Sequence, residues 1–142
     1  MALVSVTRLR VRSWQYFFWF FVKVLRSALQ ARSAGGSAAV LLFGESKNIY
    51  WTCTVWTDEA SMRSFMTSGA HRTAMPYLMK SCDEASVVHW LQDSEQVPSW
   101  SEAHRRMQSE GRRSKVNHPS EAHVAYVIPA PRVKTVRVLR FK

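Results

Sequence analysis

Residues 50–75, with the sequence YWTCTVWTDEASMRSFMTSGAHRTAM, decide the fold that this chain is expected to adopt. Residues 50–56 are rich in aromatic and β-branched side chains, which are typical of a strand. The Thr57-Asp58 pair follows at once and offers an N-cap, so a helix is expected to begin there. Ser68-Gly69 and Pro76 are expected to break that helix. The stretch therefore predicts a strand that leads directly into an interrupted helix.

The neighbouring segments extend this pattern on both sides. Residues 38–43 form a β-type run that a short polar connection joins to residues 50–56, which predicts a hairpin. Residues 2–11 alternate as a strand does, and residues 86–91 form a short apolar run of the buried type. Residues 14–32 carry apolar side chains at helical spacing. The predicted order is strand, helix, strand, strand, helix, strand, which is typical of a split βαβ arrangement.

The expected fold is therefore α+β and ferredoxin-like (βαββαβ), with an antiparallel four-stranded sheet and its helices on one face. Ser99 and Glu102 have capping-box spacing and predict an extra C-terminal helix from about residue 99, which Gly111 is expected to end. We place the domain at residues 1–115. Residues 116–142 are expected to form a partly irregular extension, because they are rich in turn residues and their last alternating run has no evident partner strand.

The helix predicted over residues 14–32 is strongly aromatic. The run is interrupted by Gln15 and Lys23 and falls short of the ~20 apolar residues that span a bilayer, so no transmembrane segment is expected. A signal peptide stays an alternative because arginines precede the run, although an aromatic rather than leucine-rich composition argues against it. We expect a cytoplasmic protein. The apolar residues of this helix that follow helical spacing are Phe17, Phe18, Phe21, Val24, Leu25, Ala28 and Leu29.

The 142-residue chain has a formal net charge of +10 at pH 7, a value that can indicate nucleic acid or anionic lipid as a partner. The basic residues gather at the two ends. Residues 1–33 hold six basic residues and no acidic one, and residues 101–142 hold ten against three, whereas residues 34–100 are net acidic. No RNP-type motif is present, so a solvated basic surface is favoured and no nucleic-acid partner is expected. An RNA or membrane-surface binder that uses the basic ends is kept as a third class of function.

Motifs of several common enzyme classes are absent. Cys53 and Cys82 lack the CxxC or Cys/His spacing of a zinc site, so reduced thiols are expected. His118 and His123 would need further ligands to hold a metal, and no metal site is predicted. The sequence contains no P-loop, dinucleotide fingerprint, HExxH motif or nucleophile elbow. Hydrolase, kinase and dehydrogenase chemistry of the usual kinds therefore lacks support.

The strand and helix of residues 50–75 resemble the antibiotic-biosynthesis-monooxygenase-like superfamily of dimeric α+β barrels. The resemblance rests on a strand that ends in Thr-Val-Trp, an Asp-Glu cap, an aromatic nine residues after the tryptophan, and Ser-Gly-Ala-His-Arg. The wider run through residues 88–90 and 98–103 is similar to uncharacterised members and to spheroidene-monooxygenase-like proteins. The resemblance covers residues 2–120 and is strongest over residues 50–105. It is more specific for the fold than for the chemistry.

This resemblance implies a homodimer in which two sheets pack into a barrel and each subunit keeps a cleft between its sheet and its helices. Some relatives oxidise polycyclic aromatics without a cofactor, and others bind or degrade haem. In the haem-degrading members the axial histidine lies on the second helix, where this chain has Met75, and His71 lies one turn earlier. The expected cofactor is accordingly none or haem, and the shift weakens the case for haem degradation.

Trp56, Phe65 and His89 are candidates for a substrate pocket, and His71 is the candidate base or haem ligand. Trp56 shares a strand face with Tyr50, and either core packing or cleft lining would suit it. Phe65 is expected to shape the pocket beside it. His71 is expected in the first turn of a restarted helix, where a lowered pKa would leave its neutral form available as a base or a haem ligand, together with Met75. A histidine that only packs a helix junction is the structural alternative. His89 is placed on the fourth strand as a core or cleft histidine.

The function that these residues favour is that of a monooxygenase-like protein that binds or oxidises an aromatic or isoprenoid ligand in a hydrophobic cleft. Whether the cleft is catalytic is left open, so the enzyme class is a possible monooxygenase, cofactor-independent or haem-dependent. A non-catalytic ligand-binding or structural dimer is the first alternative, and a haem-binding protein is the second. Without a cofactor, the substrate itself must supply the electrons for oxygen, and the protein must supply a base and a dry site.

Overall fold

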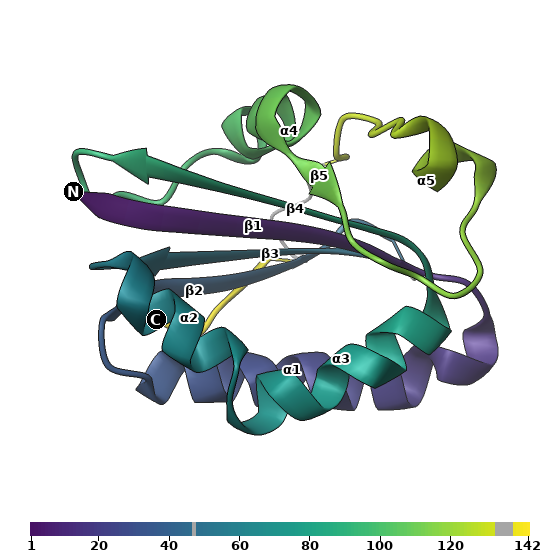
Figure 1. The fold of residues 1–142 in the computed structure, drawn as a ribbon, viewed down its shortest axis with the longest axis horizontal. Helices are drawn as coiled ribbons and strands as arrows, with labels where there is room; N and C mark the ends of the chain where they lie inside the picture. The colour runs from purple at the N-terminus through teal and green to yellow at the C-terminus, as the bar shows by residue number, and fades with distance from the viewer. Residues whose placement is uncertain (47, 133–137) are drawn as a thin grey trace.

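The computed structural model describes residues 1–46, 48–132 and 138–142 (Figure 1). Six strands form one antiparallel sheet in the order β5-β4-β1-β3-β2-β6. The strands are β1 (Ala2–Val11), β2 (Ser37–Gly44), β3 (Ile49–Trp56), β4 (Cys82–Gln92), β5 (Arg112–Arg113) and β6 (Val138–Arg140). The helices are η1 (Trp14–Tyr16, a 3₁₀ turn), α1 (Phe17–Ser33), α2 (Glu59–Met66), α3 (Gly69–Ser81), α4 (Trp100–Glu110) and α5 (Glu121–Ala125).

The ferredoxin-like α+β fold is confirmed, because β1 to β4 and the helices α1 to α3 follow the predicted order. Two features differ from the prediction. The short strands β5 and β6 extend both edges of the expected four-stranded sheet. In addition, helices cover both faces: α1, α2 and α3 lie on one side of the sheet, while α4 and α5 lie on the other (Figure 1). We call these sides the α1 face and the α4 face.

Strand β1 lies at the centre of the sheet, and its alternation divides the interior into two layers. Val4 and Val6 are fully buried on the α4 face. Ser5 and Thr7 point to the α1 face, where they border the cavity described below. Strand β1 pairs with β3 on one side and with β4 on the other, both antiparallel. The alternation that predicted this strand is therefore explained by burial on both sides.

Helix α1 packs on the sheet through only part of the apolar set that the spacing indicated, together with Phe20 and Ala31, which lay outside that set. Its buried residues are Phe20, Val24 and Ala31. Phe18, which the sequence placed on the apolar face, is instead 68% exposed, and Phe21 and Leu29 are exposed as well. This error arose because apolar side chains surround the helix, so helical spacing alone could not choose the buried side.

The helical segment after β3 is broken once rather than twice. Asp58 caps α2, its Oδ1 accepting the backbone N–H of Ser61 at 2.7 Å, as the sequence predicted. The chain breaks at residues 67–68, and α3 then continues through Pro76 to Ser81, so the predicted break at Pro76 was wrong. Helix α3 packs against α1 along its length, which offsets the loss of one backbone hydrogen bond.

The C-terminal half of the chain covers the α4 face. Ser99 Oγ accepts the backbone N–H of Glu102, which confirms Ser99 as the N-cap of α4. Ala103 and Met107 of α4 join the core that contains the fully buried Trp51. In the homodimer that the resemblance implies, this face would be buried against the sheet of a second copy. Here α4 and the segment after α5 bury it within one chain, and the homodimer stays a prediction.

Two short elements extend the fold beyond residue 115. Helix α5 is capped by Ser120, whose Oγ accepts the backbone N–H of His123. The chain ends in β6, which pairs with β2 through Leu41 and Arg140. The run 132–142 therefore has a partner strand at its end, which the sequence did not indicate, although residues 133–137 of the predicted run lie outside the described residues.

The turn before β2 requires glycine at one of two adjacent positions. Gly36 has φ +83°, and a Cβ there would meet the Ser61 side chain, whereas a Cβ on Gly35 would meet nothing within 4 Å. We expect Gly36→Ala to lower the free energy of unfolding by about 1–3 kcal/mol, because a left-handed conformation is strained for alanine. Gly35→Ala is the matched control and should change it little. Urea unfolding measures both, and an equal loss in the two variants would contradict this explanation.

Candidate functional site

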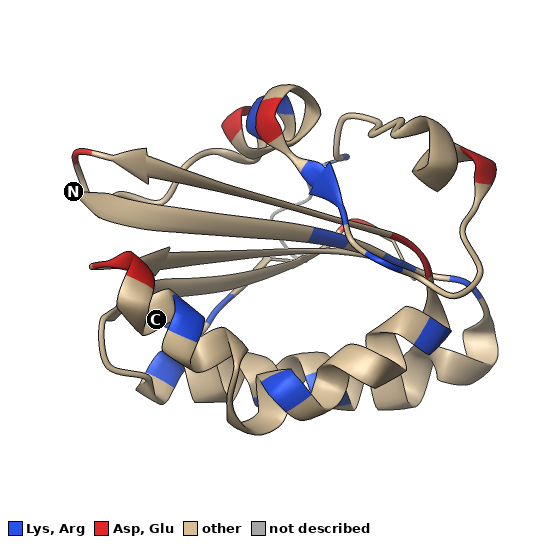
Figure 2. Cartoon of the chain, in the orientation of Figure 1, with Lys and Arg blue, Asp and Glu red and all other residues tan. Residues whose placement is uncertain are grey.

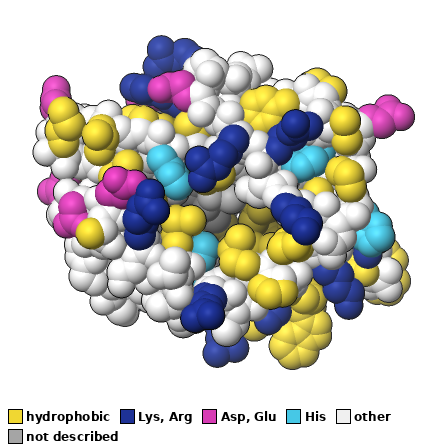
Figure 3. All heavy atoms as spheres, in the orientation of Figure 1, with side chains coloured by type: hydrophobic (Ala, Val, Ile, Leu, Met, Phe, Trp, Pro, Cys, Tyr) yellow, Lys and Arg dark blue, Asp and Glu magenta, His cyan; other side chains and the backbone are white. Residues whose placement is uncertain are grey.

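An apolar cavity of about 260 Å³ lies between the α1 face of the sheet and the helices α1, α2 and α3. Figure 3 shows a hollow on this side of the molecule, bordered by hydrophobic, basic and histidine side chains. Its wall includes the hydroxyls of Ser5, Thr7, Thr52 and Thr54 on the strands. The cavity is slightly smaller than the roughly 300–1,000 Å³ that ligand pockets occupy. Its shape and lining suit a small hydrophobic molecule.

Among the described residues that line this cavity, His71 is the one that can act as a base near neutral pH. It lies in the first turn of α3, as predicted, and its ring packs against Phe65 with centroids 4.8 Å apart. Burial lowers the pKa of His71 below its ordinary value, only partly offset by the Met66 carbonyl. That carbonyl lies 3.1 Å from Nδ1 and can only accept, so Nδ1 carries the proton of the neutral ring. The lone pair is then on Nε2.

Gln30 of α1 holds the start of α3 in place. Its Oε1 accepts the backbone N–H of His71 at 2.8 Å, and its Nε2 donates to the Ser68 carbonyl at 2.9 Å. Gly69 has φ +58°, and a Cβ there would lie 3.0 Å from the Gln30 amide. Sequence reasoning missed Gln30, because nothing in the spacing links it to a residue 41 positions later.

The predicted pocket residues Phe65 and Trp56 have different positions. Phe65 lines the cavity. Trp56 is fully buried, packs against Phe65 with ring centroids 5.2 Å apart, and is not among the residues that line the cavity. The indole N–H of Trp56 donates to Thr54 Oγ1 at 2.8 Å. Trp56 therefore supports the wall from behind and does not offer a surface on which a ligand could stack.

Met75 lines the cavity one helical turn after His71, so the two predicted cofactor residues do share a site. They do not fit a haem. Because both lie on one side of α3, they could supply an iron with one axial ligand but not with two. A porphyrin is also a large rigid ligand, and a cavity of about 260 Å³ is small for it.

His89 lies next to the cavity rather than in its wall. It stands opposite Ser5, a wall residue, across the β1–β4 pair, and its Nε2 is buried without a hydrogen-bond partner among the described residues. Burial, and after it the charge of Arg112, lowers its pKa below the ordinary value. The structure thus separates His89 from His71, and only His71 lines the cavity.

Within the described ranges, four basic residues line the cavity: Lys23, Arg112, Arg113 and Lys115. The last three follow α4, in a segment that the sequence indicated only as part of a basic region. Strand β5 brings them to this side by pairing with β4. Arg113 directs its Nη1 to the Val124 carbonyl on α5, so Lys23, Arg112 and Lys115 are the residues that make the border of the apolar cavity positively charged. This charge would favour an anionic group at the ligand's exposed end.

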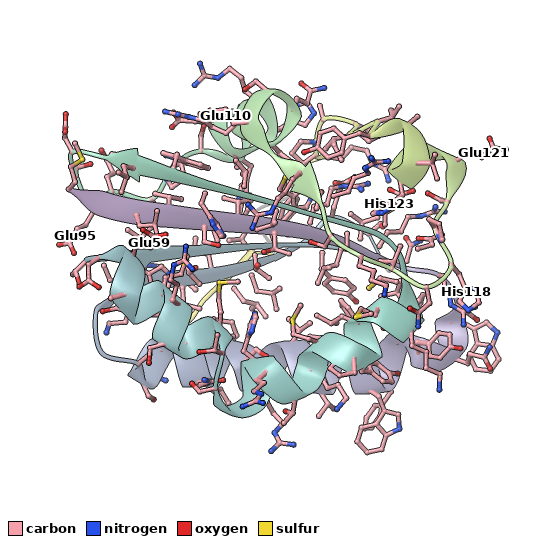
Figure 4. All side chains as sticks on the ribbon, in the orientation of Figure 1. Glu59, Glu95, Glu110, His118, Glu121 and His123 are labelled. Atoms are coloured by element: carbon pink, nitrogen blue, oxygen red, sulfur yellow. The ribbon has the colours of Figure 1, made fainter. Side chains whose placement is uncertain are left out.

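The other candidate groups do not form a site. His118 and His123 lie apart and on different segments (Figure 4), and His123 Nδ1 accepts the backbone N–H of Ala85. No three His, Cys, Asp or Glu residues in the described ranges lie together as a metal site would need. Cys53 and Cys82 are buried free thiols, and burial raises the pKa of each to about 12.

Comparison with solved structures shows which proteins share this fold. A conserved protein from Methanosarcina mazei is 17% identical with a TM-score of 0.59, and the match covers 66% of this chain and 94% of that one. A variant of SnoaB, a cofactor-independent oxygenase from Streptomyces nogalater, is 20% identical with a TM-score of 0.51, over 69% and 98% of the two chains. Rv0793 from Mycobacterium tuberculosis is 8% identical with a TM-score of 0.60, over 68% and 100%.

At these identities the likeness shows the fold alone. An antibiotic biosynthesis monooxygenase is among the matching structures, at 12% identity and a TM-score of 0.58, which confirms the fold that the resemblance of residues 50–75 implied. No curated protein matches the chain. The family described as "Domain of unknown function (DUF3291)" matches residues 21–116, a span that includes all of β2, β3, β4, α2, α3 and α4. The chain belongs to this family, DUF3291, and has the antibiotic-biosynthesis-monooxygenase-like fold.

Proposed function

We propose that the cavity binds a small hydrophobic ligand, aromatic or isoprenoid, and that the protein is a monooxygenase-like enzyme for aromatic ligands, with His71 as the base. The observation that carries this proposal is the position of a neutral histidine in the wall of an apolar cavity. The Nε2 lone pair of His71 is left available because Nδ1 donates to the Met66 carbonyl. A cofactor-independent oxygenase with the same fold is consistent with this chemistry.

Oxygenation without a cofactor needs an acidic substrate. His71 would remove a proton from a carbon that aromatic rings acidify, and the resulting carbanion would transfer electrons to oxygen. Overall, a CH₂ group and O₂ give a C=O group and water, so no external reductant is consumed. Lys23 and Arg112 at the border would stabilise the anion. An isoprenoid hydrocarbon has no such proton, and the protein would bind it without this reaction.

Anthrone, a tricyclic ketone with an acidic CH₂ group, tests binding. Titration calorimetry should detect binding by the full chain, and Ala28→Phe should weaken it at least about tenfold, because Ala28 lines the cavity. The neighbouring Leu29 is exposed on the outer side of the same helix, so Leu29→Phe is the matched control and should bind as the unaltered protein does. Equal affinities in the two variants would place the ligand outside the cavity.

Oxygen uptake with anthrone tests the role of His71. We expect His71→Gln to bind anthrone but to consume oxygen at least about 10²-fold more slowly than the unaltered protein. A loss of this size is typical when a general base is removed. Glutamine can still donate to the Met66 carbonyl, so the start of α3 should be kept. Uptake at the original rate would contradict the assignment of His71. Binding with no uptake by any variant would favour the alternative, a non-catalytic ligand-binding protein.

A further inference from the structure

The outer side of α1 is an uncovered aromatic surface. Trp14 of the preceding turn is 80% exposed, Phe18 is 68% exposed and Trp19 is 58% exposed. Phe18 and Trp19 meet edge to face, with ring centroids 5.3 Å apart. Phe21 and Leu29 are exposed on the same helix. We call these five residues the aromatic surface of α1.

Such a surface is unusual for a protein that has only water around it. Each large apolar side chain gains about 1.5–3 kcal/mol when it leaves water, and contiguous exposed apolar patches commonly mark a binding surface. The core does not need these residues, because Phe20, Val24 and Ala31 already fix α1 to the sheet. The aromatic surface is therefore free to contact something outside the described chain.

The charges around this surface indicate what that contact is. Helices α1 and α3 lie side by side as the outer layer of the α1 face, and Figure 2 shows basic but no acidic residues on them. Residues 12–33 and 69–81 contain no Asp or Glu at all. The basic residues of this layer are Arg12, Lys23, Arg26, Arg32, Arg72 and Lys80.

A second copy of this chain fits the surface poorly. If two copies met through α1, Arg26 and Arg32 of each would face an equally basic layer, with no acidic residue on α1 or α3 to pair with them. An anionic lipid bilayer complements both the positive charge and the exposed aromatic rings of this layer. Its phosphates and carboxylates attract the basic side chains, while its interface takes up Trp and Phe rings.

We propose that the aromatic surface of α1 docks on anionic membrane surfaces, with α1 lying in the plane of the interface. None of the described helices is long and apolar enough to cross a membrane, so the contact is peripheral. The inner side of the same helix lines the cavity through Val24, Ser27 and Ala28. Docking would therefore bring the cavity close to the lipid, although the proposal does not depend on the cavity's function.

Vesicle sedimentation with the full chain tests the proposal. We expect binding to phosphatidylcholine vesicles that contain phosphatidylserine, with far less binding to phosphatidylcholine alone, and a decrease as salt is added. Phe18→Ser with Trp19→Ser should reduce the partition coefficient at least about tenfold for each aromatic removed. The matched apolar control is Val124→Ser on α5, which is 60% exposed on the opposite face and should change nothing.

A second pair of variants separates charge position from total charge. Arg26→Gln with Arg32→Gln should reduce binding to anionic vesicles about fivefold for each charge removed. Arg105→Gln with Arg106→Gln removes the same charge from α4 on the opposite face and should leave binding unchanged. Equal losses in both pairs would show a non-specific attraction and overturn the proposal.

Tryptophan quenching locates the contact. Lipids with brominated acyl chains quench only indoles that they touch, and Trp14 and Trp19 are exposed whereas Trp51 and Trp56 are fully buried. Trp14→Phe with Trp19→Phe should keep vesicle binding but lose the quenching. Quenching that persists would place the contact elsewhere and overturn the proposal. A second result would also overturn the proposal. If light scattering shows a dimer, and Phe18→Ser with Trp19→Ser converts it to a monomer, the aromatic surface of α1 binds a second copy of the chain.

Discussion

Phe20→Ala is expected to lower the free energy of unfolding by about 3–5 kcal/mol, the range found when a buried Phe is truncated to Ala. Phe20 is fully buried where α1 meets the sheet, and its ring lies 5.1 Å from that of Tyr50 between centroids. Removing the ring would leave a cavity against the side chains of Leu9 and Leu42, which share its cluster. Helix α1 would then lose its main contact with the sheet.

Phe18→Ala provides the matched control, two residues away on the same helix. Its ring is 68% exposed, so the same truncation should change stability by no more than about 0.5 kcal/mol. Guanidinium unfolding of both variants measures the difference. Similar losses from the two changes would mean that α1 packs on the sheet through another side than the one described.

These two phenylalanines show where sequence reasoning stops. The order of strands and helices followed from alternation, caps and turns, which are local signals, and β1, β3 and α4 began within one residue of the predicted positions. The buried side of α1 could not be predicted, because apolar residues occur all around it. Only contact with the sheet selects Phe20 and leaves Phe18 outside.

The candidate site divides in the same way. His71, Phe65 and Met75 line one cavity, because the helical segment after the third strand brings them near one another. Gln30 and Arg112 could not be predicted. They reach the site from α1 and β5, which only the folded arrangement brings close. Trp56 was ambiguous because strand alternation gives the face of a side chain but not what lies in front of it.

A buried ion pair joins the neighbouring strands β1 and β4. Arg8 Nη1 lies 2.7 Å from Glu84 Oε1, with Arg8 only 3% exposed. Arg10 and Ser120 also donate to Glu84, through its Oε2. Burial alone would raise the pKa of Glu84, but the hydrogen bonds from Arg8 and Ser120 outweigh it, so the pKa lies below its ordinary value. The carboxylate is thus held in its charged form.

Glu84→Gln should lower the free energy of unfolding by about 3–5 kcal/mol at neutral pH, because it leaves the Arg8 charge buried without a counter-charge. The size of this loss should depend on pH. Because the pKa of Glu84 is lower in the folded protein than in the unfolded chain, its charged form stabilises the fold. This stabilisation is fully present above the pKa of the unfolded chain, about 4.3, and is lost as the pH falls through the lower pKa of the folded protein. The free energies of unfolding of the unaltered protein and of Glu84→Gln should therefore become more similar as the pH falls into the acid range.

Two controls separate the buried pair from charge in general. Glu59→Gln removes an equivalent carboxylate that pairs with Arg63 on the exposed side of α2, and it should change stability by no more than about 1 kcal/mol. Arg8→Met combined with Glu84→Leu removes both charges and should be more stable than Glu84→Gln alone, because no unpaired charge remains buried. Urea unfolding across pH measures all three. A Glu84→Gln loss no larger than that of Glu59→Gln, or one constant down to acid, would show that the pair does not hold β1 against β4.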